Sequence, residues 1–189
     1  MISLVFIRHG ATEGNLEKRY IGKTDEPLCN EGINQALKLR EFNFKNEYIF
    51  VSPMKRACET ARLIFPDANH TVVDDFKETD FGAFEGKSAS ELSENPEYIK
   101  WVDSMCTGPI PGGEDMSVFK SRCVNAFKKT VEGLPDDAEV VFVIHGGVIM
   151  AILEALSADK GDFYDYQLKN GEFIRCKFDN GKIITGVSK

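Results

Sequence analysis

Apolar residues gather in short continuous runs that recur along the chain. Four runs rich in β-branched and aromatic residues predict buried strands, at residues 4–7, 48–51, 140–144 and 173–178. Two weaker runs, at 71–73 and 183–187, are further strand candidates. The stretch 171–186 is typical of a hairpin, with Asp179-Asn180-Gly181-Lys182 as its turn.

Apolar residues at helical spacing separate these runs. They predict helices at residues 30–42, 53–65, 115–131 and 148–156. The third helix is the clearest, because Met116, Phe119 and Phe127 recur on one face and glycine and proline follow the pattern. Ser52 followed by Pro53 is typical of a helix start, so we expect the second helix to begin there.

Strands that alternate with helices predict an α/β fold, specifically a three-layer α/β/α sandwich around a central, mostly parallel sheet. At 189 residues, the chain is long enough for one domain with a substantial core. Residues 76–113 differ in being rich in Glu, Ser and Gly, with short helical pieces around Ala89 and over 96–105. We interpret them as an insertion that covers the substrate, within a single domain over 1–189.

Composition and charge exclude several classes of protein. An apolar fraction of 42% and a charged fraction of 28% are ordinary globular values, which argues against disorder. The net charge of −7 argues against a nucleic-acid partner, which would require a basic face. No stretch approaches the roughly 20 apolar residues that span a bilayer, so we expect no membrane partner.

The N-terminal residues and the cysteines indicate the compartment. The short apolar run at the N-terminus has no basic start and is broken by Arg8, which argues against a signal peptide and for a cytoplasmic protein. The five cysteines form no Cys-x-x-Cys pair, so we expect reduced, mostly structural thiols.

Polar residues directly follow three of the predicted strands. Arg8-His9-Gly10 follows the first strand, Arg56 lies just after the second, and His145-Gly146-Gly147 follows 140–144. Ligands of open parallel sheets bind beyond the carboxyl ends of the strands, so we expect these side chains at one edge. Guanidinium groups suit phosphate oxygens, and an imidazole can attack phosphorus to give a phosphohistidine.

These residues resemble a known family. Arg8-His9-Gly10-Ala11-Thr12-Glu13-Gly14-Asn15 resembles the signature of the histidine phosphatase superfamily, also called phosphoglycerate mutase-like. The resemblance continues, in order and spacing over about residues 3–156, through Arg19-Tyr20-Ile21-Gly22, Ser52-Pro53-Met54-Lys55-Arg56-Ala57, Glu78-Thr79-Asp80-Phe81-Gly82 and His145-Gly146-Gly147. One such motif would be only suggestive, whereas the combination is specific.

The resemblance implies a role for each catalytic candidate. His9 resembles the nucleophile that becomes phosphorylated. Arg8, Arg56 and His145 resemble the clamp on the phosphoryl oxygens, which acts by electrostatic stabilisation. Glu78 resembles the general acid that protonates the leaving alkoxide and then activates water.

The resemblance also implies substrate contacts. Asn15 resembles an accessory phosphate ligand, and we expect Gly146, Arg19 and Tyr20 to contact the substrate as well. Trp101 is expected mainly to pack, although it could line the substrate cover. The expected partner is a small phosphomonoester, and we expect neither a metal nor another cofactor.

The implied activity is metal-independent phosphomonoester hydrolysis. The compact length and Pro111-Gly112-Gly113-Glu114-Asp115 resemble the short phosphatase branch, which includes α-ribazole phosphatase and broad-specificity phosphatases. α-Ribazole 5′-phosphate is therefore one candidate substrate. Two alternatives stay open: a phosphoglycerate mutase, which returns the phosphoryl group to its substrate, and a non-catalytic phosphate-binding regulatory module. The leaving group and the oligomeric state do not follow from the sequence.

Overall fold

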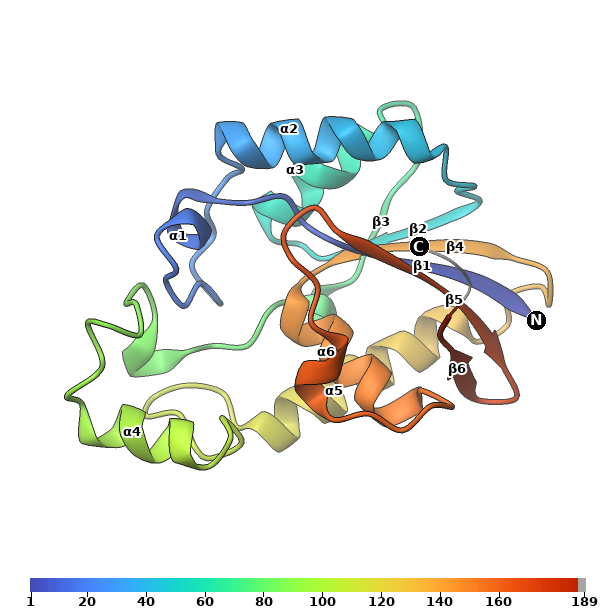
Figure 1. Cartoon of the computed structure of the whole chain (residues 1–189). Helices are drawn as coiled ribbons and strands as arrows, with labels where there is room; N and C mark the ends of the chain where they lie inside the picture. The colour runs from blue at the N-terminus through green and yellow to red at the C-terminus, as the bar shows by residue number, and fades with distance from the viewer. Residues whose placement is uncertain (187–189) are drawn as a thin grey trace.

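A six-stranded sheet lies between two layers of helices in the computed structural model, which describes residues 1–186 (Figure 1). The strands are β1 (Ile2–Arg8), β2 (Tyr48–Val51), β3 (Thr71–Val72), β4 (Glu139–Ile144), β5 (Phe173–Asp179) and β6 (Lys182–Ile184). Their order across the sheet is β3-β2-β4-β1-β5-β6; the first four strands are parallel, β5 is antiparallel to β1, and β6 is antiparallel to β5. The predicted three-layer, mostly parallel architecture is confirmed.

The main helices divide between the two faces of the sheet. One face carries α2 (Asn30–Leu39) and α3 (Lys55–Ile64), and the other carries α5 (Met116–Val131) and α6 (Gly146–Leu156). The short helices α1 (Glu13–Leu16) and α4 (Pro96–Asp103) lie at one end of the molecule, beyond the carboxyl end of β1 (Figure 1). Within residues 1–186, no helix combines the length and apolarity needed to cross a membrane.

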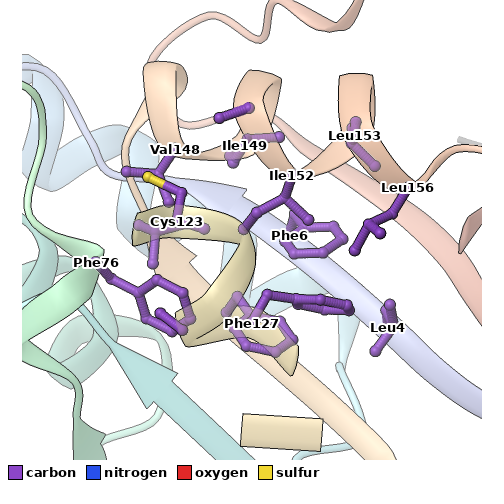
Figure 2. Packing of buried hydrophobic residues seen from close by; sticks show 14 of the residues in the cluster. Leu4, Phe6, Phe76, Cys123, Phe127, Val148, Ile149, Ile152, Leu153 and Leu156 are labelled. Carbon is purple, nitrogen blue, oxygen red and sulfur yellow. The ribbon is translucent and has the colours of Figure 1, made fainter. Parts of the chain in front are cut away.

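Two apolar clusters, one on each face of the sheet, explain why the strand sequences are continuous apolar runs. Toward α5 and α6, the ring of Phe142 lies 5.1 Å from that of Phe6 and 5.5 Å from that of Phe127. Figure 2 shows Phe6 and Phe127 in this cluster, close to the side chains of α6. Toward α2 and α3, the neighbouring positions Val141 and Val143 are buried against the other cluster. Because both faces of β4 are covered, the strand has no polar side.

The start of α3 differs from the prediction. The helix begins at Lys55 after Met54, so the expected start at Ser52-Pro53 is wrong. The amide of Ser52 instead donates to the carbonyl of Val143, which extends the pairing of β2 with β4. The Ser52 hydroxyl is used elsewhere, as described below.

Other element boundaries shift by a few residues. The helix expected at 148–156 begins at Gly146, and the one expected at 30–42 ends at Leu39 with a 3₁₀ turn after it. Ala89 lies in a turn and not in a helix. The expected strand at 183–187 appears as β6, and Val187 lies outside the described residues.

The segment between β3 and α5 has a small apolar cluster of its own. Its buried members are Phe84, Leu92, Tyr98, Trp101 and Ile110. Helix α4 begins where the Asn95 side chain accepts from two backbone amides, followed by proline at the first helical position. This cluster is separate from the two that cover the sheet, so residues 81–110 pack as a distinct lobe within the chain, whereas Phe76 belongs to the cluster toward α5 and α6.

Candidate active site

Neighbouring strands bring the two motif histidines together. His9 follows β1 and His145 follows β4, and these parallel strands pair in register up to Arg8 and Ile144. The two imidazole rings lie 5.0 Å apart, centre to centre, and meet edge to face. Arg56 enters from the first turn of α3, which follows the adjacent strand β2. The carboxyl ends of three neighbouring strands thus supply these groups.

The imidazole of His9 is held in one tautomer. Its Nδ1 lies 2.7 Å from the carbonyl oxygen of Gly10, and a carbonyl can only accept, so Nδ1 carries the proton. The lone pair therefore lies on Nε2. Burial lowers the pKa of His9 well below the usual range, and the nearby Arg56 and Arg8 lower it further. The result is a neutral imidazole with an available nucleophilic nitrogen.

His145 is oriented by two polar neighbours. Arg56 Nε donates to His145 Nδ1 over 3.3 Å, so Nδ1 accepts and Nε2 carries the proton. That Nε2–H donates to the Ser52 hydroxyl over 2.7 Å. Burial lowers the pKa of His145 well below the usual range, and Arg56 adds to the effect. Ser52, which the sequence predicted to be a helix cap, thus supports the imidazole of His145.

Backbone carbonyls hold the buried Arg56. Its guanidinium is 0% exposed and donates to the carbonyls of Thr24 and Gly22, each over 2.8 Å. The loop after the first motif therefore supplies the oxygens that solvate this cation. Burial lowers the pKa of Arg56, whereas the charge of Glu78 raises it.

The Nε of Arg8 is a buried hydrogen-bond donor without an acceptor among residues 1–186. The Nη1 of the same guanidinium donates to the carbonyl of Leu168 over 2.6 Å. Gly146 lies against this guanidinium, since a Cβ at that position would sit 3.3 Å from Arg8 Nε. An unpaired buried donor costs free energy unless an acceptor such as an oxyanion completes it.

Glu78 is anchored at the start of α6. Its Oε2 accepts from the amide of Gly147 and its Oε1 from the amide of Thr79, both over 3.0 Å. A side chain at position 147 would overlap this carboxyl group, so glycine is required for the close approach. Burial lowers the pKa values of Arg8 and Arg56, and the negative charge of Glu78 is the largest influence that raises them.

Asn15 is oriented by a residue that the sequence reading missed. Its Oδ1 accepts from the amide of Thr12 over 3.2 Å and from Asn170 Nδ2 over 3.1 Å. Asn170 also donates to the carbonyl of His9 over 3.2 Å. With Oδ1 occupied, the NH₂ group of Asn15 is the end left for a ligand. Asn170 precedes β5 outside every recognised motif, so no pattern in the sequence singled it out.

A cavity of about 450 Å³ opens over these residues. Arg8, Asn15, Glu78 and Gly146 line it, together with Arg19 and Tyr20 and a set of aromatic residues considered below. His9, Arg56 and His145 are not among its lining residues, and they are only 4%, 0% and 0% exposed. Within residues 1–186, no three His, Cys, Asp or Glu side chains are placed to hold a metal ion.

The two remaining predicted contacts line the cavity with their polar ends occupied. Arg19 Nη1 donates to Glu91 over 2.7 Å and to the carbonyl of Gly86 over 2.6 Å. The Tyr20 hydroxyl lies 2.8 Å from that of Tyr98. Both residues therefore tie the loop after α1 to the lobe that carries α4.

Comparison with known proteins identifies the family. The family model described as the histidine phosphatase superfamily (branch 1) matches residues 4–186. The chain belongs to this superfamily. It is 30% identical over 186 residues to a Bacillus subtilis (strain 168) protein named uncharacterized phosphatase PhoE, covering 96% of this chain and 91% of that protein.

Two further relatives show the range of the superfamily around this chain. A probable phosphoglycerate mutase, GpmB, of Proteus mirabilis (strain HI4320) is 29% identical, covering 82% of this chain and 75% of that protein. The crystal structure of the α-ribazole phosphatase from Shigella flexneri superposes with a TM-score of 0.86 at 22% identity, covering 98% and 95% of the two chains. This last likeness concerns the fold alone.

The two buried histidines predict a loss of stability in mild acid. Their native pKa values lie well below the 6.5 of a free imidazole, so unfolding takes up protons once the pH falls below about that value. Between about pH 6.5 and 5.5, each histidine should lower the free energy of unfolding by about 1 kcal/mol. Urea unfolding at the two pH values measures the change.

The variant His9→Gln supplies the control for this experiment. It removes one titrating group and keeps the carboxylates, so its decrease should be smaller than that of the native protein by about 1 kcal/mol. Equal decreases in the two proteins would contradict the assignment of a neutral, buried His9.

Asn170→Ala should weaken phosphate binding through Asn15. The lost hydrogen bond frees the Asn15 amide to rotate, which we expect to raise the dissociation constant for inorganic phosphate by roughly three- to tenfold. Titration calorimetry measures it. In an Asn15→Ala background the same substitution should have almost no effect. An equal loss in both backgrounds would show that Asn170 acts on phosphate independently.

Proposed function

We propose that this protein hydrolyses small phosphomonoesters through a phosphohistidine at His9, without a metal ion. The observation that carries the proposal is the Nδ1 hydrogen bond to Gly10, which leaves His9 Nε2 unprotonated beside two guanidinium groups. α-Ribazole 5′-phosphate is the first named substrate to test, since a structure with this fold bears the name of that phosphatase.

In the first step, His9 Nε2 attacks the phosphorus of the bound ester. The new N–P bond forms as the P–O bond to the alcohol breaks, and Glu78 gives its proton to the departing oxygen. Arg8 and Arg56 stabilise the charge on the phosphoryl oxygens. Arg8 Nε, which lacks a partner among residues 1–186, is the donor best suited to a new oxygen acceptor.

In the second step, water replaces the histidine. Glu78 takes a proton from the water as its oxygen attacks phosphorus, and the N–P bond breaks to release inorganic phosphate. The carbonyl of Gly10 keeps the Nδ1 proton in place throughout, so Nε2 regains its lone pair. The cycle returns both His9 and Glu78 to their starting states.

Phosphate release in excess EDTA tests the proposal. We expect release from at least one ester in a panel that includes α-ribazole 5′-phosphate and 3-phosphoglycerate. The rate should fall by at least about a thousandfold in His9→Ala, because the nucleophile is lost. His70→Ala is the matched control, since that ring lies outside the site, with its Nε2 3.2 Å from the Phe65 carbonyl oxygen.

Three results would contradict the proposal. Conversion of 3-phosphoglycerate to its 2-isomer with a bisphosphoglycerate primer, without phosphate release, would establish a mutase. A weak rate unchanged in His9→Ala would indicate a phosphate-binding module. Release that EDTA abolishes would show that a metal ion is required.

Gly147→Ala should impair proton transfer while sparing nucleophilic attack. The added methyl group displaces the Glu78 carboxyl, so hydrolysis of alkyl phosphates, whose leaving groups need a proton, should slow by about a hundredfold. The burst of 4-nitrophenol from 4-nitrophenyl phosphate should keep its rate within a few fold. Glu78→Gln is the reference variant, and equal loss on both esters would instead mean that the whole site is distorted.

A further inference from the structure

The cavity extends well beyond the groups that would hold a phosphate. Arg8, Asn15, Glu78 and Gly146 account for its phosphoryl end, and the remainder has room for the alcohol part of an ester. A volume of about 450 Å³ lies within the range of ordinary ligand pockets. The chemistry of this remaining surface therefore selects the leaving group.

Aromatic residues form much of that remaining surface, beside polar side chains such as those of Thr79, Gln167 and Asn170. Six aromatic residues line the cavity: Tyr20, Phe81, Phe119, Phe163, Tyr164 and Trp101. They come from separate elements, namely the loop after α1, the α4 lobe, α5 and the 3₁₀ turn Phe163–Tyr166. The residues Met116 and Met150 add flexible apolar surface from α5 and α6.

The aromatic residues of the α4 lobe form a fixed wall. The ring of Tyr20 lies 5.2 Å from that of Phe81 and 5.6 Å from that of Trp101, the latter in edge-to-face contact. Trp101 is only 5% exposed and also packs on Phe84, so the wall is anchored in the cluster of the lobe. Such preorganised aromatic surface favours an apolar ring over a flexible polar group.

Among residues 1–186, no fixed and unpaired cation lines the part of the cavity beyond the phosphoryl end. Apart from Arg8, the cavity is lined by two cationic residues, Lys18 and Arg19. Arg19 is already paired with Glu17 and Glu91. Lys18 is exposed, where its interactions are screened by solvent. A carboxylate placed among the aromatic rings would lose hydration and gain at most the solvent-screened charge of Lys18.

We propose that the cavity receives the alcohol part of the ester as an uncharged apolar group of the size of an aromatic ring, an inference that rests on the proposed phosphatase activity. The segment around α4 thus acts as the specificity wall for the leaving group. Esters of anionic alcohols such as glycerate are disfavoured, because their carboxylate would lose hydration against the aromatic rings.

Three primary alkyl phosphates test the inference at constant leaving-group chemistry. The substrates are 3-phenylpropyl phosphate, propyl phosphate and 3-phosphoglycerate. We expect kcat/KM for the phenyl ester to exceed the other two by about 10- to 100-fold, as burial of most of a phenyl ring implies. Equal values for the three esters, or a preference for 3-phosphoglycerate, would overturn the inference.

The outcome separates this inference from the proposed function. Hydrolysis that depends on His9 but shows no phenyl preference would leave the phosphatase activity standing and refute the apolar leaving group. No hydrolysis of any ester, 4-nitrophenyl phosphate included, would refute the proposed function and this inference with it.

The variant Phe81→Ala tests whether the preference for the phenyl ester arises from the aromatic wall. Phe81 is half-buried, so its truncation should lower kcat/KM for 3-phenylpropyl phosphate about tenfold, mainly through KM, and leave propyl phosphate within about twofold. Phe173→Ala is the control, because this half-buried ring packs on Phe42 and Phe44 away from the cavity. If Phe81→Ala fails to fold, Phe81→Leu replaces it, and an equal loss on both esters would overturn the assignment.

Discussion

The burial of the Arg56 guanidinium is the constraint on which the rest of the site depends. A fully buried cation is costly unless polar groups replace its hydration. The carbonyls of Gly22 and Thr24 supply that replacement, and His145 accepts from Nε. The loop after α1 must therefore fold back over α3. The same fold of the loop brings Tyr20 to the cavity. The buried charge of Arg56 therefore fixes the loop that links the phosphoryl end of the site to the proposed aromatic wall.

Burial, reinforced by the same positive charge, sets the protonation state of the histidines. Burial and the two arginines keep both imidazoles neutral, so His9 can act as a nucleophile and His145 as a hydrogen-bonding partner. Glu78 reaches this centre from the opposite side, anchored to the amide of Gly147 at the start of α6. The proposed mechanism uses these two groups, His9 as the nucleophile and Glu78 as the acid and base.

The two halves of the site have different structural origins. The phosphoryl half stands on the ends of paired strands in the centre of the fold, where the register of β1 and β4 fixes the spacing of His9 and His145. The wall proposed to contact the leaving group belongs mainly to a lobe with its own small cluster of apolar residues. Because that lobe packs separately from the sheet, its lining can change while the phosphoryl half is kept. Such a division fits a superfamily whose members near this chain carry the names of phosphatases and mutases.

The sequence by itself determined the sheet, its covering helices and the residues proposed to carry the phosphoryl chemistry. Buried strands leave long apolar runs, and the polar residues that follow them necessarily meet at one edge of a parallel sheet. Only the tertiary structure decided that Ser52 supports His145, that Asn170 orients Asn15, and that Arg19 is paired with acidic neighbours. These contacts join residues between 2 and 155 positions apart, mostly in irregular segments. No local periodicity encodes such pairings, because they arise only when packing closes the chain around the cavity.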